Sequence, residues 1–149
     1  MLLNLLVGIP VMLLCLLMQA YFVALCLKYF VRYRKLWQGH DSQLRNTGYL
    51  AVVMLLMLLG NFVQMAIWAA LFRLLGEFDD FATALYHSAV NFATLGYGDI
   101  VMSGAWRLLG PLEAANGILM FGVSTAVMTA AVTEVIKLHM SRGLHKQDD

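Results

Sequence analysis

Residues 77–99 read EFDDFATALYHSAVNFATLGYGD, and this stretch decides the fold. Its acidic start, from Glu77 to Asp80, is typical of the cap of a helix, and the largely apolar run 81–93 predicts the helix itself. At about 1.5 Å per residue that helix would cross only about half of a bilayer. Polypeptide that enters a membrane without crossing it must be buried in protein or line water. The stretch therefore predicts a re-entrant segment that leads into residues 94–99.

Long apolar blocks flank this stretch on both sides. Met1–Leu27, Gly48–Phe72 and Ala114–Thr133 contain no charged residue, and each exceeds the roughly 18 residues that a helix needs to cross hydrocarbon. The whole chain of 149 residues is 61% hydrophobic and 13% charged, which is more apolar surface than a water-soluble domain could bury. We therefore expect an all-α membrane protein with three transmembrane helices.

Residues 94–99, TLGYGD, have the composition of a loop that binds bare cations with its backbone. A dehydrated potassium ion needs oxygens in place of its water, and stacked rings of carbonyls can supply them. Inward carbonyls require left-handed backbone at alternate residues, which glycine adopts at little cost, as at Gly96 and Gly98. The predicted potassium ligands are the carbonyls of Thr94, Leu95, Gly96 and Tyr97 together with the hydroxyl of Thr94.

The same residues carry a resemblance to a known family. TLGYGD resembles the TVGYG filter of tetrameric potassium channels, and residues 116–122, NGILMFG, resemble their inner helix with its glycine hinge. The likeness covers about a third of the chain closely. It implies a bacterial-type pore domain with an additional N-terminal helix, assembled as a homotetramer. Leu95 in place of valine, Ala93 in place of threonine, and Val90 where some members carry a carboxylate depart from the family pattern.

The filter that the resemblance implies consists of Thr94 to Gly98. The resemblance also implies roles for residues outside this filter. Asp99 would lie at the outer mouth, and Gly117 and Gly122 are candidate hinges, although small residues in membrane helices also mark close packing. Ile118, Phe121 and Thr125 share one helical face and would line the cavity, unless Phe121 packs between helices.

We divide the chain into four segments: a transmembrane helix at 1–31, a basic cytoplasmic linker at 32–47, a pore domain at 48–137 and a short cytoplasmic tail at 138–149. Within the pore domain we expect the pore helix at 81–93, the filter at 94–99 and the inner helix at 107–137.

The positions of the basic residues predict the orientation. The positively charged segments are 28–45 and the chain after Lys137, whereas Arg73 and Arg107 lie on the opposite side. Because basic loops stay in the cytoplasm, we expect the N-terminus outside and the C-terminus inside a cell (inner) membrane. The balanced net charge of +1 gives no reason to expect nucleic acid as a partner. Membrane lipids and identical chains are the expected partners, and no cofactor is expected beyond permeant potassium.

Potassium-selective conduction is the leading functional hypothesis. A less selective monovalent cation channel and a non-conducting membrane subunit are the alternatives, and no constellation of residues suggests an enzyme. Two ionisable residues in apolar surroundings have open roles. Glu113 is expected to find a polar partner and act structurally. His87 could sense pH behind the filter, although a histidine in such a position is more often packed and hydrogen-bonded.

Overall fold

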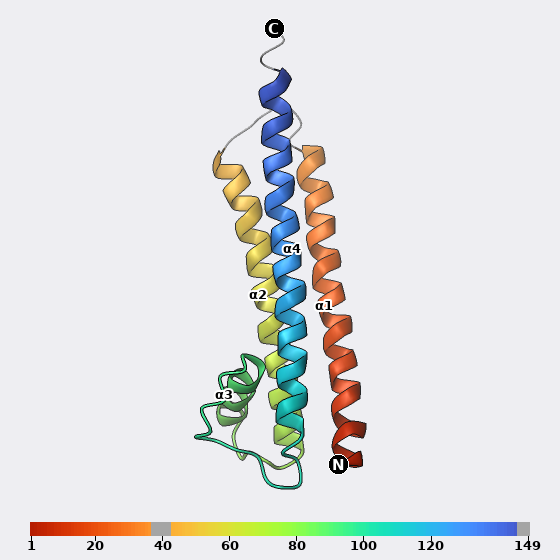
Figure 1. Cartoon of the computed structure of the whole chain (residues 1–149), viewed down its shortest axis with the longest axis vertical. Coiled ribbons are helices and arrows are strands. Elements are labelled where there is room, and N and C mark those ends of the chain that lie inside the picture. Colours follow the sequence, from red (N-terminus) through yellow and green to blue (C-terminus); the bar gives the residue numbers. More distant parts are fainter. Residues whose placement is uncertain (37–42, 146–149) are drawn as a thin grey trace.

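The computed structural model describes the backbone of residues 1–36 and 43–145, and the side chains of residues 1–33 and 43–137. Its helices are α1 (Leu2–Leu36), α2 (Gln43–Leu74), α3 (Phe81–Phe92) and α4 (Leu109–His145). Figure 1 shows α1, α2 and α4 as three long rods side by side, with α3 beside the end at which the N-terminus lies. The C-terminus lies at the opposite end.

Three segments are long and apolar enough to cross a membrane. They are Leu2–Tyr33, Gln43–Leu74 and Leu109–Lys137. The described residues form helices, turns and loops but no strand. The prediction of an all-α chain with three spans, and a short helix between the second and the third, is confirmed.

Several boundaries differ from those expected. Helix α1 continues to Leu36 and α2 starts at Gln43, so both ends of the predicted linker 32–47 are helical, and residues 37–42 lie outside the described part. The sequence near these ends is rich in Lys, Arg, Leu and Gln, which are good helix formers and do not stop a helix.

The C-terminal segments differ in a similar way. Helix α4 begins at Leu109 instead of residue 107, after turns at 104–108, and it continues to His145. Most of the predicted tail 138–149 is thus an extension of α4, because no proline follows Lys137 to stop it. Helix α3 is one residue shorter than predicted, with Ala93 as its C-terminal cap.

The interior consists of two apolar clusters joined by a polar layer. The cluster beside α3 includes Trp68 and Phe72 of α2, Phe92 of α3 and Met120 of α4. The cluster farther from α3 includes Phe22, Tyr49, Val53 and Met57, with Ala131 of α4. Because each cluster includes residues of all three long helices, the spans of one chain form a single packed unit.

Helix α1 packs against α2 and α4, and in the described part of the chain none of its Cα atoms lies within 8 Å of a Cα atom of α3. A glycine on each side of these contacts allows close approach: Gly60 of α2 lies against the ring of Phe22 of α1, and Gly8 of α1 lies against Leu112 of α4. The opposite face of α1 exposes leucines, including Leu6 and Leu17. The helix therefore lies against the other two spans on one side of the bundle, whereas α3 packs on those two spans away from α1 (Figure 1).

Buried amides hold α1 in place between the two clusters. The Gln19 Nε2 donates to Ser124 Oγ at 3.0 Å, and the Gln64 Nε2 donates to Gln19 Oε1 at 2.7 Å. Asn61 of α2 also donates to Ser124 Oγ, at 3.4 Å. All four side chains are buried, so this amide cluster (Gln19, Asn61, Gln64 and Ser124) joins the three spans by hydrogen bonds in an apolar setting.

Candidate functional site

The site begins at the N-terminus of α3. Asp80 adopts an extended backbone conformation, and its Oδ1 accepts a hydrogen bond from the Thr83 backbone N–H at 2.9 Å. Its second carboxylate oxygen accepts from the Thr83 hydroxyl. These two bonds lower the pKa of Asp80. The acidic cap predicted from the sequence is confirmed, and it fixes where α3 starts.

At its other end, α3 unwinds into residues 94–99. Thr94 N–H donates to the Asn91 carbonyl at 2.8 Å, and Leu95 N–H donates to the Val90 carbonyl at 2.9 Å. These bonds fix the direction in which the chain leaves the helix. The partial negative charge of the helix C-terminus consequently lies next to Thr94.

The backbone then alternates between two conformations. Positive φ values occur at Thr94 (57°), Gly96 (61°) and Gly98 (73°), whereas Leu95 and Tyr97 between them do not have positive φ. An extended backbone turns successive carbonyls to opposite sides, and a left-handed residue at every second position reverses that alternation. We predicted this alternation of backbone conformations from Gly96 and Gly98, because it is the pattern required to turn successive carbonyls to one side.

Thr94 was not predicted to share this conformation. A β-branched residue rarely adopts positive φ, because its Cβ crowds the neighbouring carbonyl. Thr94 and the two glycines together give the loop three left-handed positions in five residues. Strain of this kind persists only where the surrounding structure imposes it, and it concentrates at functional sites.

All six residues of the loop are exposed on the single chain. Leu95 is 55% exposed and Tyr97 is 66% exposed, and no hydrogen bond from Tyr97 to α3 is present in the described residues. Most of the Tyr97 surface is therefore left uncovered by its own chain. Its ring and the Leu95 side chain are free to contact another molecule.

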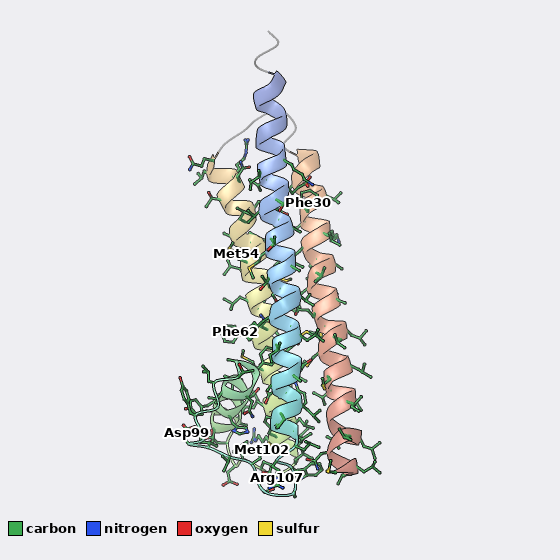
Figure 2. All side chains as sticks on the ribbon, viewed as in Figure 1. Phe30, Met54, Phe62, Asp99, Met102 and Arg107 are labelled. Carbon is green, nitrogen blue, oxygen red and sulfur yellow. The ribbon has the colours of Figure 1, made fainter. Side chains whose placement is uncertain are left out.

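Hydrogen bonds attach the loop and the following segment to the rest of the chain. The Tyr86 hydroxyl of α3 donates to Asp99 Oδ2 at 2.6 Å. Farther along, both the N–H and the hydroxyl of Ser103 donate to the Glu77 carboxylate, each at 2.6 Å. Asp99 lies at the outer edge of the loop region (Figure 2). The bond from Tyr86 favours the charged carboxylate and lowers the pKa of Asp99.

His87 lies behind the loop and is packed and hydrogen-bonded. Its Nδ1 lies 3.1 Å from the Ile100 carbonyl oxygen, and its Nε2 lies 2.9 Å from the Asn91 Nδ2. Because the Asn91 amide nitrogen can only donate, Nε2 accepts and Nδ1 carries the hydrogen. Burial lowers the pKa of His87, so the imidazole is neutral at neutral pH. In this form it connects α3 to the residue after Asp99.

The end of α3 rests directly on α4 at Gly117. A Cβ atom built on Gly117 would lie 2.0 Å from the Phe92 carbonyl oxygen, which is far too close for any side chain. Around Gly122, by contrast, no described atom beyond its chain neighbours and the nearby backbone of α4 lies within 4 Å of such a Cβ. Of the two predicted hinge glycines, Gly117 thus serves close packing, while the open space at Gly122 is compatible with bending.

The predicted cavity face of α4 is exposed on the single chain. Ile118 is 63% exposed, and Thr125 is also exposed. Phe121 is 38% exposed and also contacts the Phe92 ring edge-on, with centroids 5.5 Å apart. The three residues lie on the side of α4 left open by the other helices, and Phe121 additionally belongs to the contact between α3 and α4.

A buried polar group between α3 and α4 was only partly foreseen. Glu113 is fully buried and hydrogen-bonds the Ser88 hydroxyl, which also donates to the Met65 carbonyl oxygen at 2.8 Å. The sequence indicated that Glu113 needs a polar partner but did not identify Ser88. The available signal was a polar residue on a short apolar helix, and Ser88 shares that property with His87 and Asn91.

Comparison with known proteins agrees with this architecture. A family model described as an ion channel matches residues 56–134, which is more than half of the chain. The chain therefore belongs to this ion channel family, and it is an integral membrane protein with an ion channel pore domain. No curated protein matches the chain. No solved structure matches it either.

Proposed function

We propose that the chain is one subunit of a homotetrameric, potassium-selective channel, with residues 94–98 as the filter. The observation that carries this proposal is the alternation of left-handed backbone at Thr94, Gly96 and Gly98. A ring of such strands presents carbonyl oxygens toward a common axis, and these replace the water around a potassium ion. The carbonyls of Thr94, Leu95, Gly96 and Tyr97, with the Thr94 hydroxyl, are the proposed ligands.

One chain supplies only one wall of such a pore. The exposed loop cannot face lipid, because unsatisfied backbone groups there would each cost several kcal/mol, on the order estimated for polar groups in hydrocarbon. Exposed Leu95 and Tyr97 also require cover. Four chains around an axis supply both the carbonyl rings and the neighbouring protein, and the exposed α4 face with Ile118 and Thr125 then lines the cavity below.

The charges support an orientation for this assembly. Four acidic residues lie in the segments that flank α3 or end the filter: Glu77, Asp79, Asp80 and Asp99. We place this end outside the cell, where it concentrates cations, and the basic ends of α1 and α4 in the cytoplasm. The N-terminus lies at the α3 end, so it is extracellular in this orientation (Figure 1).

Ion flux through purified protein in vesicles tests the proposal. Wild-type protein is expected to pass potassium much faster than sodium. Gly98→Ala places a side chain at φ 73° and is expected to remove this preference while membrane insertion persists. Gly104→Ala is the matched control, because Gly104 has open space around it and no left-handed backbone.

The outcomes separate the three functional hypotheses. Equal potassium and sodium flux identifies a less selective cation channel, and no flux at all identifies a non-conducting subunit. Mass measurement in nanodiscs tests the assembly separately. A stable monomer or dimer with no larger species contradicts the proposed tetramer.

A further inference from the structure

Glu113 is a carboxyl group in the interior of a membrane protein, and the proposed conduction path does not use it. It lies near the start of α4 and has no exposed surface. It hydrogen-bonds Ser88 of α3, and Asn91 of α3 and Cys15 of α1 also interact with it; all three side chains are uncharged. In the part of the chain that the structure describes, no Lys or Arg pairs with it. An ionised carboxylate in such surroundings would lack a compensating charge.

The hydrogen bonds of Ser88 determine which group carries the proton. The Ser88 hydroxyl has a single hydrogen and two oxygen partners, the Met65 carbonyl at 2.8 Å and Glu113 Oε1. A carbonyl oxygen can only accept, so Ser88 can hydrogen-bond both partners only if its own hydrogen points to Met65. The contact between Ser88 and Glu113 then needs a hydrogen from Glu113 itself. Without one, two oxygen lone pairs would face each other inside the protein.

We infer that Glu113 is held as a neutral carboxylic acid that donates its proton to Ser88 and thereby positions α3 against α2 and α4. The chain of bonds runs from the acid on α4, through the Ser88 hydroxyl on α3, to the Met65 carbonyl on α2. Among the described residues, the remaining oxygen, Oε2, has no hydrogen-bond partner. A missing hydrogen bond costs far less free energy for the carbonyl oxygen of a neutral acid than for an oxygen of a charged carboxylate.

Neutrality also suits the proposed pore. A fixed negative charge behind the filter would add to the attraction for a cation, and conduction requires binding weak enough for release. A neutral acid fixes the helix through a hydrogen bond without adding that charge. The positioning role rests on the proposed channel function, whereas the protonation state does not.

Infrared difference spectroscopy of the full chain in lipid tests the protonation state directly. Wild type minus Glu113→Gln is expected to show the carbonyl stretch of an un-ionised carboxylic acid, and isotopically labelled glutamate should shift that band. Asp79→Asn, at an exposed position, is the control and should show carboxylate bands instead. Carboxylate bands in the Glu113→Gln difference spectrum would overturn the inference.

Two further variants keep the test decisive. If Glu113→Gln does not fold, Ser88→Ala is expected to move the same acid band to higher frequency, because the acid loses its acceptor. An unmoved band overturns the assigned bond.

Potassium flux tests the positioning role. Glu113→Gln retains an N–H donor toward Ser88 and should preserve potassium flux, whereas Glu113→Leu should lose it. Equal loss in both folded variants refutes positioning. An acid band in a wild-type protein that conducts no potassium would refute the proposed function and leave the protonation state standing.

Discussion

The Cα atom of Gly117 faces the carbonyl oxygen of Phe92 with no room for a side chain, since a Cβ there would lie 2.0 Å from that oxygen. Phe92 is the last residue of α3, two positions before Thr94. Helix α4 therefore contacts the backbone that leads into the proposed filter. Any displacement of α4 at Gly117 acts directly on the end of α3.

The surroundings of the two glycines predict different effects of Gly117→Ala and Gly122→Ala on the stability of the chain. Gly117→Ala should lower the stability of the folded chain by about 1–3 kcal/mol or more, because backbone must shift to admit the methyl group. Gly122→Ala meets no described atom within 4 Å beyond its chain neighbours and the nearby backbone of α4, and should leave the thermal midpoint unchanged or higher. Thermal unfolding in detergent measures both. Equal destabilisation by the two variants would show that the packing at Gly117 is not as described.

The bond from Tyr86 to Asp99 predicts a change in pH dependence. The bond lowers the pKa of Asp99, so it favours the charged form, and its contribution is lost only as pH falls through that lowered value. Tyr86→Phe removes the donor, which returns the pKa of Asp99 toward its ordinary value. Loss of potassium flux on external acidification should then begin at higher pH in Tyr86→Phe than in wild type.

A matched control exists on α1. Tyr21 is exposed and its ring contacts Phe22, so Tyr21→Phe removes a hydroxyl far from the loop. Its flux should follow the wild-type pH profile. If Tyr86→Phe also follows that profile, the hydroxyl of Tyr86 does not control the charge of Asp99.

The amide cluster predicts how α1 is attached. Gln19→Leu deletes the bonds to Ser124 and Gln64 and leaves the Gln64 amide buried without its acceptor. We expect a loss of about 1–2 kcal/mol, in the range of hydrogen bonds within membranes and of orphaned polar groups. Adding Gln64→Leu should recover part of this loss. Circular dichroism during heating measures it, with Leu17→Ala on the exposed face of α1 as the control. No difference between Gln19→Leu and Leu17→Ala would rule out a stabilising cluster.

The exposed face of α4 predicts which positions water reaches. With Cys15 and Cys26 replaced, Ile118→Cys and Thr125→Cys should react with a charged thiol reagent from the cytoplasmic side when the channel is open. Phe121→Cys should react more slowly, because residue 121 also packs on Phe92. Reaction rates from mass spectrometry measure this. Inert cysteines at 118 and 125 in a conducting channel would mean that another face of α4 lines the cavity.

The sequence predicted those features that follow from local patterns. The three spans and the half-length helix arise from lengths of apolar residues, and the Asp80 cap arises from an acidic residue before a helix. The left-handed backbone at Gly96 and Gly98 follows from the rarity of that conformation in other residues. Each of these signals is contained within a few neighbouring positions.

The remaining features depend on residues far apart in the chain. Ser88 and Glu113 are separated by 25 positions and Gln19 and Ser124 by 105, so no local pattern connects them. The positive φ of Thr94 contradicts the preference of a β-branched residue and is imposed by its surroundings. The helix ends at Leu36 and His145 were missed because charged residues end an apolar run without ending a helix.

The central claim is that residues 94–98 select potassium. The reversal potential of the purified channel in a planar bilayer, with potassium on one side and sodium on the other, tests it most directly. We predict a reversal potential close to the potassium equilibrium value for wild type and for Gly104→Ala, and a shift toward zero for any residual current in Gly98→Ala. A wild-type reversal potential near zero, or an unchanged one in Gly98→Ala, would contradict the account.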